Sequence, residues 1–136
     1  MNTTLPFSRE RALEWALRVA VAGEFLGHGV FAVQGKAQWI GWIQEILSVD
    51  APTATTLLTL VGLSDIAVAA AVLMWRKVPR AVLLWAAAWG FWTALVRPLV
   101  GEPIWDFIER FANWGAPLAL LLVYGWPKAL REWFRS

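Results

Sequence analysis

The amino-acid sequence predicts an all-α protein, a membrane four-helix bundle with one or two short interfacial amphipathic helices. The first observation is the composition, since 59% of the 136 residues are hydrophobic and only 16% are charged. The second is a mean hydropathy of +0.53, which is high for a soluble domain. The third is that apolar segments, most of them close to the ~20 residues of a spanning helix, fill most of the chain. We therefore expect residues 1–136 to form a single transmembrane domain in the lipid bilayer.

The apolar segments define the expected spanning helices in order. The first three lie at about residues 12–34, 53–75 and 80–97, and each approaches the length that a spanning helix needs. The fourth, at about residues 114–130, has a shorter apolar stretch and contains prolines, so a tilted or partly re-entrant helix is the alternative. The tight basic turn at residues 76–80 predicts that the second and third segments are antiparallel neighbours.

Two linkers have the periodicity of short amphipathic helices. In residues 37–47, one side carries Trp39, Ile43, Ile46 and Leu47. In residues 103–112, apolar side chains follow the spacing i, i+3, i+4, i+7 at Ile104, Phe107, Ile108 and Phe111. This pattern predicts helices that lie in the membrane interface.

The basic residues predict the topology. One set of segment ends carries Arg9, Arg11, Arg18, Arg76, Lys77, Arg80, Lys128, Arg131 and Arg135. The opposite ends carry Lys36, Arg97 and Arg110. By the positive-inside rule, the N- and C-termini should be cytoplasmic, in a multi-pass protein of the cell inner membrane. Since these residues are explained by topology, we expect no nucleic-acid partner. The absence of cysteine excludes thiol redox chemistry within the chain.

Ionisable residues occur where lipid is expected. Glu24 and His28 lie one helical turn apart in the first segment, and Asp65 lies near the centre of the second. A charged side chain at the bilayer centre costs about 2.5–3.5 kcal/mol on insertion scales, so these groups need partners, water or a proton. Arg97 ends the third segment. We expect its guanidinium to reach inward to a carboxylate rather than outward to the acidic linker.

Three interpretations of these residues are open, and the first is a pocket for a lipophilic head group such as a quinone. In this pocket, Glu24, His28 and Asp65 would be the catalytic residues, which accept protons or donate hydrogen bonds. Arg97 would bind the ligand by stabilising negative charge. The ring walls would come from tryptophans that share one face of the third segment, namely Trp85, Trp89 and Trp92.

The second interpretation is structural. The same ionisable residues would form a buried network that fixes helix register, with close packing allowed by the glycines Gly23, Gly27 and Gly29. The third interpretation is a metal site built from the same carboxylates and imidazole. Because the chain has a single histidine, we predict no metal.

The first two segments resemble those of DoxX-like small membrane proteins. In "LRVAVAGEFLGHGVFAVQGK", the similar positions are Arg18, Gly23, His28, Gly29 and Lys36. In "GLSDIAVAAAVLMW", a glycine precedes an acidic residue and small residues, at Asp65, Ala69 and Ala70. The resemblance covers essentially the whole chain. It implies a four-helix bundle and, for some members, a role as the membrane subunit of a sulfur- or quinone-linked oxidoreductase. More distant relatives act as membrane chaperones or cargo receptors.

The functional prediction combines the pocket and the resemblance. We predict an integral membrane accessory subunit of a redox system that binds quinone or another lipophilic ligand in a polar intramembrane pocket. Any catalysis would occur within a quinone-linked oxidoreductase complex, with a membrane or soluble redox partner, and a homo-oligomer is a further candidate assembly. The alternative is a non-catalytic scaffold, chaperone or assembly factor. A proton-coupled carrier is less favoured, because four helices without an internal repeat leave little room for alternating access.

Overall fold

The computed structural model describes residues 8–136, so residues 1–7 of the expected domain lie outside the described part. The elements are α1 (Arg9–Val33), α2 (Ala37–Leu47), α3 (Ala51–Met74), α4 (Arg80–Leu99), α5 (Ile104–Ile108), α6 (Phe111–Val123) and the 3-10 helix η1 (Leu130–Trp133). The described chain is all-helical, without strands, as the sequence predicted. Three of its helices, α1, α3 and α4, are long and apolar enough to cross a membrane.

Local sequence explains where the long helices begin. Ser8 caps α1, because its side-chain oxygen accepts a hydrogen bond of 3.2 Å from the backbone N–H of Arg11. Asp50 caps α3 in the same way, accepting a hydrogen bond of 2.8 Å from the N–H of Thr53. Pro52 in the first turn of α3 has no N–H to leave unsatisfied.

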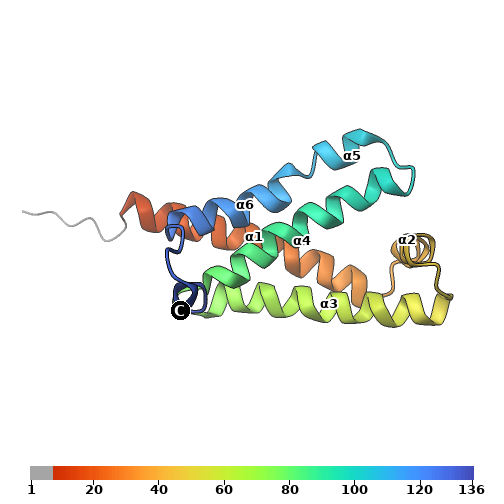
Figure 1. The fold of residues 1–136 in the computed structure, drawn as a ribbon, viewed down its shortest axis with the longest axis horizontal. Helices are drawn as coiled ribbons and strands as arrows, with labels where there is room; N and C mark the ends of the chain where they lie inside the picture. Colours follow the sequence, from red (N-terminus) through yellow and green to blue (C-terminus); the bar gives the residue numbers. More distant parts are fainter. Residues whose placement is uncertain (1–7) are drawn as a thin grey trace, which may run out of the picture.

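The helices form an arc that is open between α3 and α4. α1 packs along α3 and also contacts α6, while α4 packs against α6 and α5 (Figure 1). α3 and α4 run in opposite directions but diverge from the turn that joins them (Figure 1). The two segments are therefore antiparallel, as expected, but they are not close packing partners. Each has its close partner elsewhere, α3 in α1 and α4 in α6.

Glycines explain this choice of partners. A Cβ on Gly29 of α1 would lie 2.7 Å from a side-chain carbon of Ile66 and 2.8 Å from the carbonyl oxygen of Gly62, both on α3. A Cβ on Gly90 of α4 would collide with the backbone carbonyl of Asn113 on α6. Small residues thus let each pair of backbones approach closely.

The other glycines of the first segment do not support close packing. A Cβ built on Gly23 or Gly27 would meet nothing within 4 Å, so neither glycine is required by a contact within residues 8–136. Of the three glycines that we expected to allow helix approach, only Gly29 does so.

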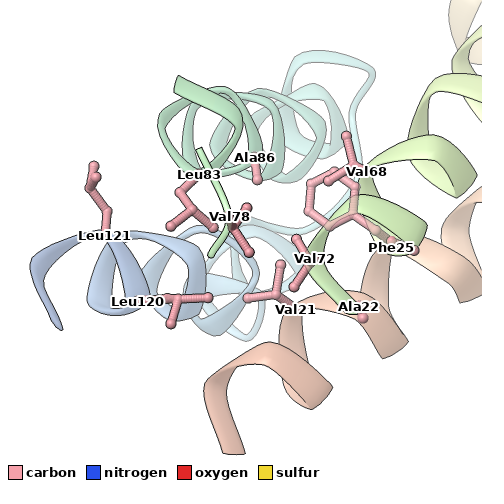
Figure 2. Packing of buried hydrophobic residues seen from close by; sticks show 11 residues of the cluster. Val21, Ala22, Phe25, Val68, Val72, Val78, Leu83, Ala86, Leu120 and Leu121 are labelled. Carbon is pink, nitrogen blue, oxygen red and sulfur yellow. The ribbon is translucent and has the colours of Figure 1, made fainter. Parts of the chain in front are cut away.

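The apolar core lies near the end of the helices where a short turn joins α3 to α4. In Figure 2, side chains from α1, α3, α4 and α6 gather there, namely Val21, Ala22, Phe25, Val68, Val72, Leu83, Ala86 and Leu120. Leu121 of α6 belongs to the same buried cluster. In a bilayer, such contacts stabilise the fold through close packing and dispersion rather than through removal from water. This core holds the four helices together at the end where α3 and α4 are joined.

The C-terminal third differs from the sequence prediction. The fourth helix is α6, which ends at Val123 rather than near residue 130, because the chain turns at Gly125 with a φ of 83°. The predicted amphipathic helix at 103–112 is broken as well. Only α5 is helical before a turn at residues 109–110, and Phe111 already belongs to α6. In Figure 1, α5 and α6 follow one another along α4.

Candidate functional site

A cavity of about 350 Å³ lies where α3 and α4 diverge. α3 and α4 form its side walls, α2 contributes another wall, and His28 is its lining residue from α1. Most of the lining is aliphatic or aromatic, and its ionisable side chains are His28, Asp65 and Arg97. The volume and the few polar groups in an apolar lining are typical of small-molecule sites.

The cavity brings together most of the residues that the sequence singled out. Its lining includes His28, Asp65, Trp89, Trp92 and Arg97, which come from three different helices. It also includes Trp39 and Trp42 of α2, which the sequence analysis did not assign to the site. The signal for Trp39 was its place on the amphipathic face of residues 37–47, which we interpreted only as a membrane-facing surface, whereas Trp42 was not among the residues that defined this face.

Two predicted site residues, Glu24 and Trp85, are not part of the lining. Trp85 is half exposed and stacks on Trp89, with ring centroids 5.5 Å apart and an interplanar angle of 11°. Glu24 is partly buried and near enough to Asp65 for the two carboxylates to repel each other when both are charged. Each of the two therefore lies near a lining residue, Trp85 against Trp89 and Glu24 near Asp65.

Asp65 is one of three buried side chains with an unpaired polar atom in the described part of the chain. Its side chain is 4% exposed, and its Oδ1 accepts no hydrogen bond from any residue between 8 and 136. The side chain of Trp89 faces the carboxyl group from α4. The indole N–H of Trp39, also in the lining, is buried without an acceptor among the described residues. An unpaired buried polar group costs about 1–3 kcal/mol, so its retention calls for an explanation.

Arg97 does not compensate Asp65. Its guanidinium donates a hydrogen bond of 2.7 Å to the carbonyl oxygen of Thr93 and lies 5.3 Å from the ring centroid of Trp42. The carboxylates near enough to attract it lie in the segment that joins α4 to α6, at Glu102, Asp106 and Glu109. The described chain has no ion pair between Arg97 and either intramembrane carboxylate, so the inward pairing that we expected is not formed.

His28 lines the cavity beside Trp39. The two rings make an edge-to-face contact, with centroids 5.4 Å apart and an interplanar angle of 86°. No group of three or more histidine or carboxylate side chains in the described residues is arranged to hold a metal ion. The cavity therefore combines an imidazole, a carboxyl and a guanidinium, each with an indole ring beside it.

A second polar cluster lies at the opposite end of the helices, and the sequence analysis missed its role. Arg18, only 3% exposed, donates from Nε to the carbonyl oxygen of Val72 at 2.7 Å. Its other donors reach the carbonyl oxygens of Leu73, Trp75 and Arg76. These carbonyls belong to the last turn of α3 and to the two residues that follow it, so Arg18 caps α3 from a neighbouring helix.

The same cluster ties the last helix to the first. Glu14 pairs with Arg18 at 3.3 Å and accepts a hydrogen bond of 2.6 Å from the hydroxyl of Tyr124. Arg80 donates to the carbonyl oxygens of Tyr124 and Gly125, at 2.6 and 2.8 Å, and so caps α6. Burial, followed by the hydrogen bond to Glu14, raises the pKa of Tyr124 to about 12. We call Glu14, Arg18, Arg80 and Tyr124 the capped end.

Comparisons with protein-family models, with curated proteins and with solved structures found no match to this chain.

Proposed function

We propose that the chain crosses the membrane four times, with α5 and α6 together making the fourth crossing. α6 alone has 13 residues, about 20 Å of helix, which is short for a bilayer. The path from Ile104 to Val123 is longer, and it returns the chain to the end where α1 begins (Figure 1). The basic residues at that end favour a cytoplasmic location for both termini, in the cell inner membrane.

We further propose that the cavity binds the head group of a membrane-soluble ligand, of which a quinone is the leading candidate. The observation that carries this proposal is the buried Asp65, whose Oδ1 has no partner within the described chain. Native folds satisfy such groups with a protein, water or ligand partner. A ring with polar substituents would fill the apolar space and give this carboxyl group its missing hydrogen bond.

Each neighbouring side chain has a distinct part in this proposal. Protonated Asp65 donates a hydrogen bond to one ring oxygen, and His28 donates to another. Arg97 stabilises negative charge that develops on the ring. Trp89 and Trp92 provide its flat walls. Behind them, Glu24 exchanges protons with Asp65, and Trp85 supports Trp89 by stacking.

The proposed physiological role is that of an accessory subunit in a membrane redox system. Reduction of a quinone to a quinol consumes two electrons and two protons. The chain contains no cysteine that could ligate an iron–sulfur cluster or relay electrons, so we assign the electrons to a redox partner protein. The two intramembrane carboxyl groups, Asp65 and Glu24, then each supply one proton and take another from water.

The test is to purify the protein from membranes that contain quinone and to analyse the lipids that remain bound. Wild type and Glu45→Gln should retain quinone, because Glu45 is an exposed carboxylate on α2 outside the cavity. Asp65→Asn and His28→Ala should lose it while remaining folded. Absence of quinone from every preparation, together with a loss of thermal stability in both cavity variants, would contradict the proposal and favour a structural network in a non-catalytic scaffold.

A further inference from the structure

The side of the cavity between α3 and α4 is rimmed by exposed apolar side chains. Leu60 on α3 lines the cavity and is 58% exposed. Trp92 on α4 lines it from the other wall and is 41% exposed. In a protein that spans a bilayer, exposed leucine and tryptophan side chains on long apolar helices face lipid. The cavity thus has an apolar mouth on the side where these two helices separate.

The polar groups lie away from this mouth. Asp65 is almost fully buried, and Arg97 is 6% exposed. On the side toward the chain's outer linkers, α2 supplies Trp42, Ile43 and Leu47 to the lining, so a water-soluble compound would have to pass this apolar helix. A largely apolar interior with a few buried polar groups, entered through an apolar mouth, fits a ligand with a ring-like head group that carries polar atoms and with a hydrocarbon tail.

We infer that the ligand is a tailed amphiphile that reaches the cavity sideways from the bilayer, between α3 and α4, and leaves its tail in lipid beside Leu60. This inference rests on the proposed function and specifies its ligand class. A space of about 350 Å³ accommodates a ring-sized head group but leaves little room for a long chain. The tail then stays in an apolar medium throughout binding, which avoids the cost of bringing it into water.

The natural absence of cysteine allows the mouth to be blocked at a single position. Leu60→Cys would be labelled in detergent with a benzyl maleimide and reconstituted into vesicles. Leu63→Cys, labelled identically, is the matched control, because Leu63 is 55% exposed on the same helix but does not line the cavity. The probe is a benzoquinone with a decyl tail, and the readout is the quinone held by captured protein against incubation time.

The label on Leu60→Cys should slow quinone uptake at least tenfold relative to the unlabelled variant, whereas the label on Leu63→Cys should change it less than twofold. Equal uptake by labelled and unlabelled Leu60→Cys, with binding intact, would overturn lateral access and leave the proposed function standing. Failure of unlabelled protein to bind the quinone at all would overturn the proposed function and this inference together. The two failures are therefore distinguishable.

Discussion

The capped end and the cavity contain the same kinds of ionisable side chain, but an arginine and a carboxylate pair with each other at the capped end, whereas those of the cavity do not. At the capped end, Arg18 is buried with a carboxylate partner and several carbonyl acceptors. In the cavity, the buried Arg97 and Asp65 form no ion pair with each other, and an oxygen of Asp65 lacks any partner among the described residues. A satisfied network holds helices together, whereas an unsatisfied one retains capacity for a ligand. On the proposed function, the capped end is structural and the cavity is the binding site.

The free carbonyl oxygens at helix ends explain why the polar side chains of the capped end find hydrogen-bond partners. The last turn of α3 offers several free carbonyl oxygens, and the guanidinium of Arg18 offers five N–H donors in a fixed plane. Asp65 lies in mid-helix, where the backbone N–H groups are already used within α3. Its partner must therefore be a side chain, water or a ligand.

The largest expected effect is on the capped end. Arg18→Met should lower the free energy of unfolding by about 3–5 kcal/mol, because it leaves Glu14 and the carbonyls of α3 without their donor. Thermal unfolding of the detergent-solubilised protein measures this loss. Arg11→Met is the control, since Arg11 is exposed on the same helix. If both variants unfolded at the wild-type temperature, the capped end would not be a structural element.

A smaller effect is expected at the contact that pairs α1 with α3. Gly29→Ala should cost about 1–3 kcal/mol, because the new methyl group would meet the backbone oxygen of Gly62 at 2.8 Å and force the helices apart. Gly27→Ala should leave the unfolding temperature unchanged or slightly raised, since its methyl group meets no atom within 4 Å. The same unfolding assay compares them. Equal losses in both variants would remove the role assigned to Gly29.

Local patterns in the sequence were enough for several elements of the fold. The amphipathic helix was expected at residues 37–47, and α2 runs from Ala37 to Leu47. The second apolar segment was expected at residues 53–75, and α3 runs from Ala51 to Met74. Hydropathy and periodicity predict such elements because a helix in lipid satisfies its backbone hydrogen bonds within its own segment.

Other features depend on contacts between segments and were not visible in one-dimensional patterns. The end of α6 at Val123, by contrast, has a local signal that the prediction did not use, since Gly125 with its positive φ follows shortly after it. The divergence of α3 from α4 depends on glycine contacts with other helices. Their short connecting turn gave no sign of it.

The candidate site was predictable in kind but not in detail. His28, Asp65 and Arg97 stood out because ionisable residues are rare in lipid, and all of them line one cavity. The capping role of Arg18 was hidden because its acceptors are backbone carbonyls, which every residue possesses. Sequence marks the side chains that need partners, but it does not identify backbone groups as those partners.

A smaller, pH-dependent effect sharpens the comparison at the capped end. The pKa of Tyr124 is raised from 10.0 to about 12 in the folded protein. As pH rises through this range, the unfolded tyrosine loses its proton while the folded one keeps it, so Tyr124 stabilises the fold below pH 10 and loses that contribution toward pH 12. Tyr124→Phe should remove this part of the pH dependence and cost about 1 kcal/mol at neutral pH.

Unfolding temperatures of wild type and Tyr124→Phe between about pH 9 and pH 12 give the measurement, because both share the titration of lysines and differ only in this hydroxyl. Parallel curves for the two proteins would show that the pKa of Tyr124 is not raised in the folded protein.

The most direct test of the account is Asp65→Leu, measured in protein stripped of bound lipid. If the carboxyl group is retained for a ligand, this variant should unfold at the same temperature as wild type or higher, because an unpaired buried polar group is replaced by an apolar one of similar size. It should also lose quinone binding. A fall in the unfolding temperature as large as that of Arg18→Met would contradict the account and show that Asp65, like Arg18, holds the helices together.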